Sequence, residues 1–89
     1  MSIAEQHVFD RLSDCQGPNI VRLMREHRVT IRELARRMDV SQRRVRDIRN
    51  YGTGGFGVFL DCWEAITGLS YRTSPRLTTL FQLFREAID

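Results

Sequence analysis

The sequence predicts an all-α protein, a compact bundle of about five short helices, in a single domain that spans residues 1–89. Apolar residues recur three and four positions apart in successive segments, and this spacing places them on one face of a helix. Residues that favour helix starts, and breaks at Gly or Pro, separate these segments. The 89 residues, 42% of them hydrophobic, suffice for one small helical core and leave no room for a second domain.

Two helices are expected before residue 30. Residues 3–14 are predicted to form a short helix that ends at the Gly17-Pro18 break. Residues 19–27 follow, with Ile20, Leu23 and Met24 on one face. We expect His27 to lie at the edge of the core rather than to bind a ligand.

Residues 31–38 and 42–50 are predicted to form two short helices that pack across a tight turn at Asp39-Val40. Each of the two segments has a single apolar stripe. The apolar positions of this pair are Ile31, Leu34, Ala35, Met38, Val45 and Ile48.

Both helices of this pair carry start signals. Thr30 followed by Glu33 matches a capping box for the first helix, and Ser41 is an N-cap candidate for the second. Glu33 also precedes Arg37 by four residues, and an acid placed one turn before a base favours an ion pair on the helix surface. Local sequence therefore supports both helices independently of their apolar pattern.

This pair of helices resembles the helix-turn-helix of the lambda-repressor and Cro-like (XRE-type) transcriptional regulators over residues 30–48. Ala35 matches the small residue where the second helix crosses the first, and Val40 matches the apolar residue of the turn. Two positions depart from the family: Asp39 stands where Gly is frequent, and Ile31 where Gln is frequent. Asp tolerates the left-handed backbone that the turn needs, whereas Ile31 lacks the phosphate contact that Gln provides. The residues that match the family's core positions are Leu34, Met38, Val45 and Ile48.

Basic residues are concentrated around the two helices. The net charge of the chain is +3, but residues 20–50 contain ten Arg against four acidic residues and alone carry +6. Such a block is expected for a protein that binds a polyanion, although a solvated charged face is the alternative. The chain contains no Lys, so the use of Arg in place of Lys is not by itself evidence of function. The position of each Arg in the sequence is the informative feature.

The helix at residues 42–50 presents a polar face when Val45 and Ile48 point inward. Arg side chains can hydrogen-bond to guanine, and those of Gln and Asn can hydrogen-bond to adenine, while Asp can accept a hydrogen bond from cytosine. This face is therefore predicted to read bases in the major groove. The resemblance supports Gln42, Arg43 and Asp47 in particular. The predicted base-reading residues are Gln42, Arg43, Arg46, Asp47 and Asn50.

A second group of polar residues flanks this face and points away from the apolar stripes. Hydroxyl groups at helix N-termini and guanidinium groups are typical partners of DNA phosphates. The predicted phosphate contacts are Thr30, Arg32, Arg36, Arg37, Ser41, Arg44 and Arg49.

A glycine-rich segment follows at residues 51–57. Gly52, Gly54 and Gly57 satisfy the G-x-G-x-x-G pattern, but a dinucleotide site needs a strand before the glycines and an acidic residue about twenty positions later. We interpret the segment as a reversal between helices whose free amides can meet a phosphate. A further core helix is expected over residues 58–66, closed by Gly68.

The C-terminal segment, residues 74–89, is predicted to be an amphipathic helix with Ser74 as N-cap and Pro75 as its first residue. Its apolar residues extend beyond one stripe, so packing against a small domain would leave part of this apolar surface exposed. The helix either closes the core or, as we favour, also forms part of a homodimer interface. The predicted interface residues are Leu80, Leu83, Phe84 and Ile88.

Several other classes of protein are not expected. No arrangement of nucleophile and base suggests an enzyme, and no cofactor site is recognised. Cys15 and Cys62 lie within helical apolar patterns and are expected as small buried side chains rather than as a disulfide. No Cys or His pair, including His7 and His27, has zinc-site spacing. No segment is apolar for long enough to span a membrane, and we expect a cytoplasmic protein of bacterial, phage or mobile-element origin.

The sequence thus predicts a transcriptional regulator, of the repressor kind, that binds a palindromic operator in double-stranded DNA as a homodimer. A recombination-directionality or plasmid-maintenance factor that uses the same DNA-binding motif is one alternative. The other is an antitoxin-like interaction module whose partner is a protein. Neighbouring genes, or a footprint on DNA, would distinguish the three.

Overall fold

Five α-helices and one short 3-10 helix make up the part of the chain that the structure describes. The computed structural model describes residues 15–88, apart from the side chains of residues 84, 87 and 88. No strand occurs in this range, so the predicted all-α class is confirmed. The predicted helix at residues 3–14 lies outside the described residues. The elements are α2 (Gly17–Glu26), α3 (Ile31–Met38), α4 (Gln42–Tyr51), α5 (Phe56–Thr67), η2 (Tyr71–Thr73) and α6 (Pro75–Ile88).

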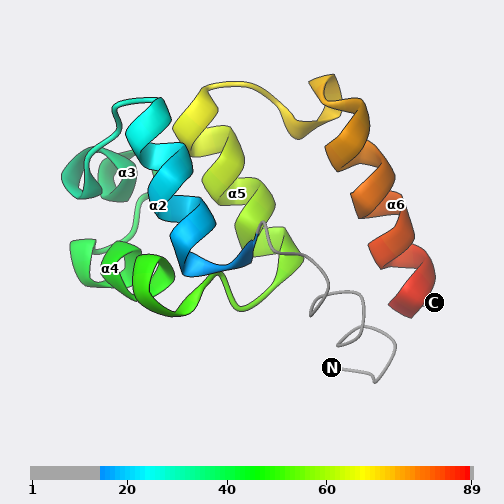
Figure 1. Cartoon of the computed structure of the whole chain (residues 1–89), viewed down its shortest axis with the longest axis horizontal. Helices are drawn as coiled ribbons and strands as arrows, with labels where there is room; N and C mark the ends of the chain where they lie inside the picture. Colours follow the sequence, from blue (N-terminus) through cyan, green and yellow to red (C-terminus); the bar gives the residue numbers. More distant parts are fainter. Residues whose placement is uncertain (1–14, 89) are drawn as a thin grey trace.

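Helices α2 and α5 lie side by side in the middle of the described part (Figure 1). The short helices α3 and α4 pack against them on one side. On the other side of α5, η2 and α6 complete the fold. The α3–α4 pair therefore lies at one end of the molecule and the C-terminal helix at the other.

Two helices begin earlier than the sequence suggested. Helix α2 starts at Gly17 rather than Asn19, because the Gln16 carbonyl accepts hydrogen bonds from the N–H groups of Asn19 and Ile20 at 3.1 and 3.2 Å. Pro18 fits this first turn, where its missing N–H has no partner to lose. Helix α5 starts at Phe56 rather than residue 58. At the end of α2, His27 is exposed, so its expected place at the edge of the core is wrong.

The predicted caps of the α3–α4 pair are present. Thr30 Oγ1 accepts the N–H of Glu33 at 3.1 Å, and Ser41 Oγ accepts the N–H of Arg44 at 3.0 Å. Asp39 takes the left-handed conformation expected for the turn, with φ 55° and ψ 48°. In the capping box only the Thr30 half is formed, because the Glu33 carboxylate bonds to neighbouring Arg side chains instead.

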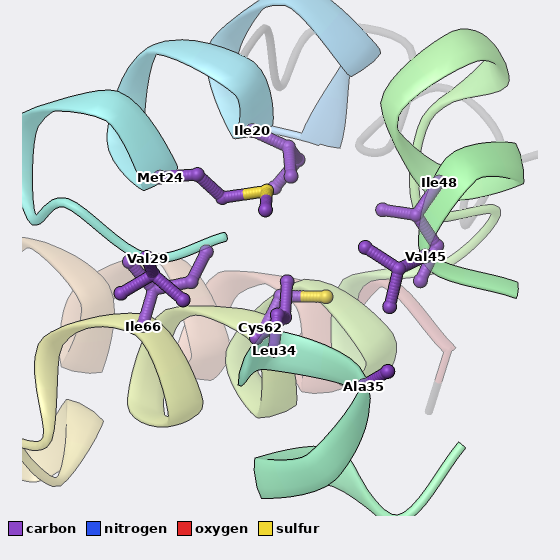
Figure 2. Close-up of a cluster of buried hydrophobic side chains, with 9 residues drawn as sticks. All are labelled: Ile20, Met24, Val29, Leu34, Ala35, Val45, Ile48, Cys62 and Ile66. Carbon is purple, nitrogen blue, oxygen red and sulfur yellow. The ribbon is translucent and has the colours of Figure 1, made fainter. Parts of the chain in front are cut away.

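The main core unites four helices (Figure 2). Val45 and Ile48 of α4 point toward side chains of α2, α3 and α5, and both are fully buried. Ala35, the small residue of α3, is also buried and leaves space for α4 to approach. The buried members are Ile20, Met24, Val29, Leu34, Ala35, Val45, Ile48, Cys62 and Ile66.

A second cluster attaches α6 to α5. Its buried members are Cys15, Phe56, Phe59, Leu60 and Leu77, with Trp63, Tyr71, Leu80 and Phe81 partly buried against them. The ring centroids of Tyr71 and Phe81 lie 5.3 Å apart, and those of Phe56 and Phe59 lie 5.9 Å apart, distances typical of aromatic pairs. Cys15 and Cys62 are both buried, as predicted, and no disulfide joins them.

Candidate functional site

The buried side chains of α4 fix the orientation of the helix about its own axis. Val45 and Ile48 lie in the main core, and residues three apart in a helix share a face. The opposite face must therefore point to solvent. Ser41 fixes the beginning of the helix by bonding the N–H of Arg44.

The end of α4 is fixed by close backbone contact with the start of α2. A Cβ added at Gly17 would overlap the carbonyl oxygen of Arg49, so only glycine allows the two backbones to lie this close. Gly52 ends α4 with φ 92°, a conformation that side chains rarely adopt, and donates its N–H to Ile48 at 2.8 Å. The next residue, Thr53, donates its N–H to the Cys15 carbonyl at 2.9 Å. The start of α4 is thus capped locally by Ser41, and its end is anchored to α2 and to Cys15, which precedes α2.

The five predicted base-reading residues lie together on the exposed face of α4. All of them are exposed: Gln42, Arg43, Arg46, Asp47 and Asn50. No ion pair joins Arg43 to Asp47 among residues 15–88, so these two side chains do not neutralise each other. The face therefore presents two cations, one carboxylate and two amides to solvent.

Most of the predicted phosphate contacts border this face or lie on α3. Arg32, Arg36 and Arg44 are exposed, and Arg49 is half-buried. The hydroxyl groups of Thr30 and Ser41 lie at the N-termini of α3 and α4. Each hydroxyl oxygen accepts a backbone hydrogen bond, and its own O–H proton is left to donate.

Arg37 differs from the other arginines because it bonds within the domain. Its Nη1 donates to the carbonyl oxygens of Ala65 at 2.9 Å and Ile66 at 3.4 Å, in the last turn of α5. Its Nε donates to Glu33 Oε1 at 3.0 Å. A cation at the C-terminal end of a helix is favourable because the last carbonyl groups lack partners within the helix. Arg37 thus connects α3 to α5.

Glu33 is the shared partner of two arginines on α3. Arg36 Nε donates to its Oε2 at 3.1 Å, and Arg36 also pairs with its Oε1. Hydrogen bonds from Arg36 and then Arg37 lower the pKa of Glu33 from 4.5 to about 2. The predicted pair of Glu33 with Arg37 is confirmed.

One exposed residue at the end of the α4 face was not predicted as part of the site. Tyr51 was assigned to the glycine-rich segment, but it is the last residue of α4, and 84% of it is exposed. Its position, four residues after Asp47, was the available signal, because residues four apart share a face if the helix continues that far. The phenol extends the polar face by one residue.

The predicted dimer residues have different surroundings. Leu83 is 50% exposed, whereas Leu80 is partly buried against its own chain's second cluster. The side chains of Phe84 and Ile88 lie outside the described part. Leu69, between α5 and η2, is a further exposed apolar residue at 54%.

Within residues 15–88 no cluster of His, Cys, Asp or Glu could hold a metal ion. No described helix has the length and apolar character required to cross a membrane. Comparison of the chain with family models, curated proteins and solved structures finds no match.

Proposed function

We propose that the chain is a sequence-specific DNA-binding regulator of transcription, in which α3 and α4 form a helix-turn-helix and α4 enters the major groove. The observation that carries the proposal is the exposed face of α4. Five side chains able to bond base edges lie on a helix whose opposite face, Val45 and Ile48, is buried. Groups that read bases must be held rigidly, and α4 is capped at its start by Ser41 and lies against α2 at its end.

The connection between the two helices supports this proposal. Helix α3 has eight residues, and a left-handed Asp39 turns the chain directly into α4. A short turn of this kind is typical of a helix-turn-helix, in which the first helix lies across the DNA backbone and the second lies in the groove. Arg32 and Arg36 on the exposed side of α3 are then placed to bind phosphates.

The charge distribution supports a nucleic-acid partner. The +6 charge of residues 20–50 lies on the segment that contains the proposed reading helix. We assign phosphate contacts to Thr30, Arg32, Arg36, Ser41, Arg44 and Arg49. Arg37 is left out, since its guanidinium group bonds to backbone carbonyls at the end of α5, whereas Arg36 pairs with Glu33 on the exposed surface of α3.

A homodimer on a palindromic operator is part of the proposal, with repression as the mode that the family resemblance implies. Helix α6 lies at the opposite end of the molecule from the α3–α4 pair, so an interface on α6 leaves the reading face free (Figure 1). Two-fold symmetry of the protein would then match two-fold symmetry of the site.

The test is a selection of binding sites from random double-stranded DNA, followed by footprinting. A compact palindrome supports the regulator, and repeated sites at an attachment or partition region support the recombination or plasmid-maintenance alternative. Absence of any ordered footprint contradicts DNA recognition and favours the protein-binding module. Arg72→Ala is the control, because it removes one exposed positive charge from η2, outside the α3–α4 pair.

A further inference from the structure

A cleft of about 540 Å³ opens between α3, α4 and α5. Its apolar walls include Met38, Val40 and Val58, all of them half-buried. The volume falls within the range of roughly 300–1,000 Å³ that is typical of small-molecule sites. The cleft lies beside the turn that joins α3 to α4.

Four charged residues also line the cleft, and two of them already have partners. Arg37 bonds to Glu33 and to the end of α5, and Glu64 Oε2 accepts the N–H of Tyr71 at 2.9 Å. The side chains of Arg44 on α4 and Asp61 on α5 are exposed and make no hydrogen bond or ion pair within residues 15–88. One cation and one anion therefore remain without a partner among the described residues, in a cleft that also has an apolar wall.

We propose that this cleft binds a small zwitterion with an apolar body, of the class of the hydrophobic α-amino acids. The ligand carboxylate pairs with Arg44, whose planar guanidinium group suits a carboxylate. The ligand ammonium pairs with Asp61, and the apolar body lies against Val40 and Val58. A simple anion or cation would satisfy only one of the two free charges, whereas a zwitterion satisfies both.

Occupation of the cleft weakens DNA binding, a part of the inference that rests on the proposed function. Arg44 belongs both to the cleft and to the proposed phosphate contacts. A carboxylate that holds Arg44 removes one phosphate contact per protomer, which lowers the slope of log affinity against log salt by roughly 1. The ligand would therefore act as an inducer that releases the protein from its site.

Ligand binding is tested on the full chain without DNA, by calorimetric or NMR titration with L-leucine and L-phenylalanine. We expect saturable binding, weakened by about tenfold or more in Arg44→Gln and in Asp61→Asn, because each change removes a bond between charged groups. The methyl ester and the N-acetyl derivative, which each lack one charge, should be weakened similarly. Arg25→Gln, an equal change on an exposed α2 residue outside the cleft, should bind as the unmodified chain does.

Absence of saturable binding at about 10 mM for both amino acids would overturn the proposal. Equal affinity for the ester and the free acid would overturn the assignment of Arg44, even if the cleft is filled. Coupling is then measured by titrating DNA with and without ligand. If the ligand binds but the affinity for DNA is unchanged, only the inducer role is contradicted. If the ligand binds to a chain that does not bind DNA, only the proposed function is contradicted.

Discussion

Arg37 of α3 donates a hydrogen bond to the backbone carbonyl of Ala65 near the end of α5, with 2.9 Å between Nη1 and the oxygen. The two residues are 28 positions apart in the sequence. This bond holds the first helix of the proposed motif against the core helix. It gives Arg37 a structural role that the neighbouring Arg32 does not share.

Replacement of Arg37 by Ala should therefore reduce stability rather than phosphate binding. We expect the free energy of unfolding to fall by about 1 kcal/mol, because charge-assisted bonds to two carbonyls are lost at a partly exposed position. Denaturant unfolding measures the loss. Arg32→Ala is the matched variant, for which stability should be unchanged and the salt slope of DNA binding should fall by roughly 1 per protomer. The reverse pattern for the two variants would contradict these roles.

A second prediction concerns the contact between α2 and α4. Gly17→Ala should destabilise the protein by about 1–3 kcal/mol, because the new methyl group overlaps the Arg49 carbonyl and forces the helices apart. Gly57→Ala is the control: this glycine lies in α5 with open space around it, so stability should stay the same or rise by up to about 1 kcal/mol. Thermal unfolding of both variants makes the comparison. Equal effects would show that the backbone contact is unimportant.

The low pKa of Glu33 predicts a pH-dependent contribution to stability. A carboxylate whose pKa is lowered from 4.5 to about 2 favours the folded state fully above pH 4.5, and the contribution is lost as pH falls toward 2. The difference in Tm between the unmodified chain and Glu33→Gln should therefore shrink between pH 5 and pH 2.5. A Glu33→Gln difference that is constant over this range would refute the prediction.

The apolar surplus of α6 predicts self-association. Leu83 is half exposed, and burial of such a side chain contributes about 1.5–3 kcal/mol, so Leu83→Glu should convert a homodimer to a monomer in light scattering. Gln82→Glu adds the same charge at the next residue of α6, which is exposed, and should leave the dimer intact. If the unmodified chain is a stable monomer at micromolar concentration with α6 folded, the dimer prediction is wrong.

Local signals in the sequence predicted much of the fold. The bounds of α3 follow from the Thr30 cap and the Asp39 turn, and the start of α4 follows from Ser41, because these features depend on a few adjacent residues. The starts of α2 and α5 were placed two residues late, since a Gly-Pro pair and a glycine-rich segment resemble loops in the sequence.

Long-range features of the site could not be predicted in the same way. The bond from Arg37 to α5 and the approach of Gly17 to Arg49 depend on how distant helices pack. The exposed face of α4 was predictable, because Val45 and Ile48 alone determine which residues are opposite them. Tyr51 was missed because α4 continues one residue further than the pattern suggested.

The most direct test of the central claim is a binding selection with randomised DNA, carried out with the unmodified chain and with Gln42→Ala, Arg43→Ala and Arg46→Ala. If α4 reads bases, Arg43→Ala should relax the preference at one defined base in each half-site and cost about 1–3 kcal/mol there. Arg72→Ala, with the same loss of charge on η2, should keep every preference. Unchanged preferences in all three α4 variants would contradict the assignment of α4 as the reading helix.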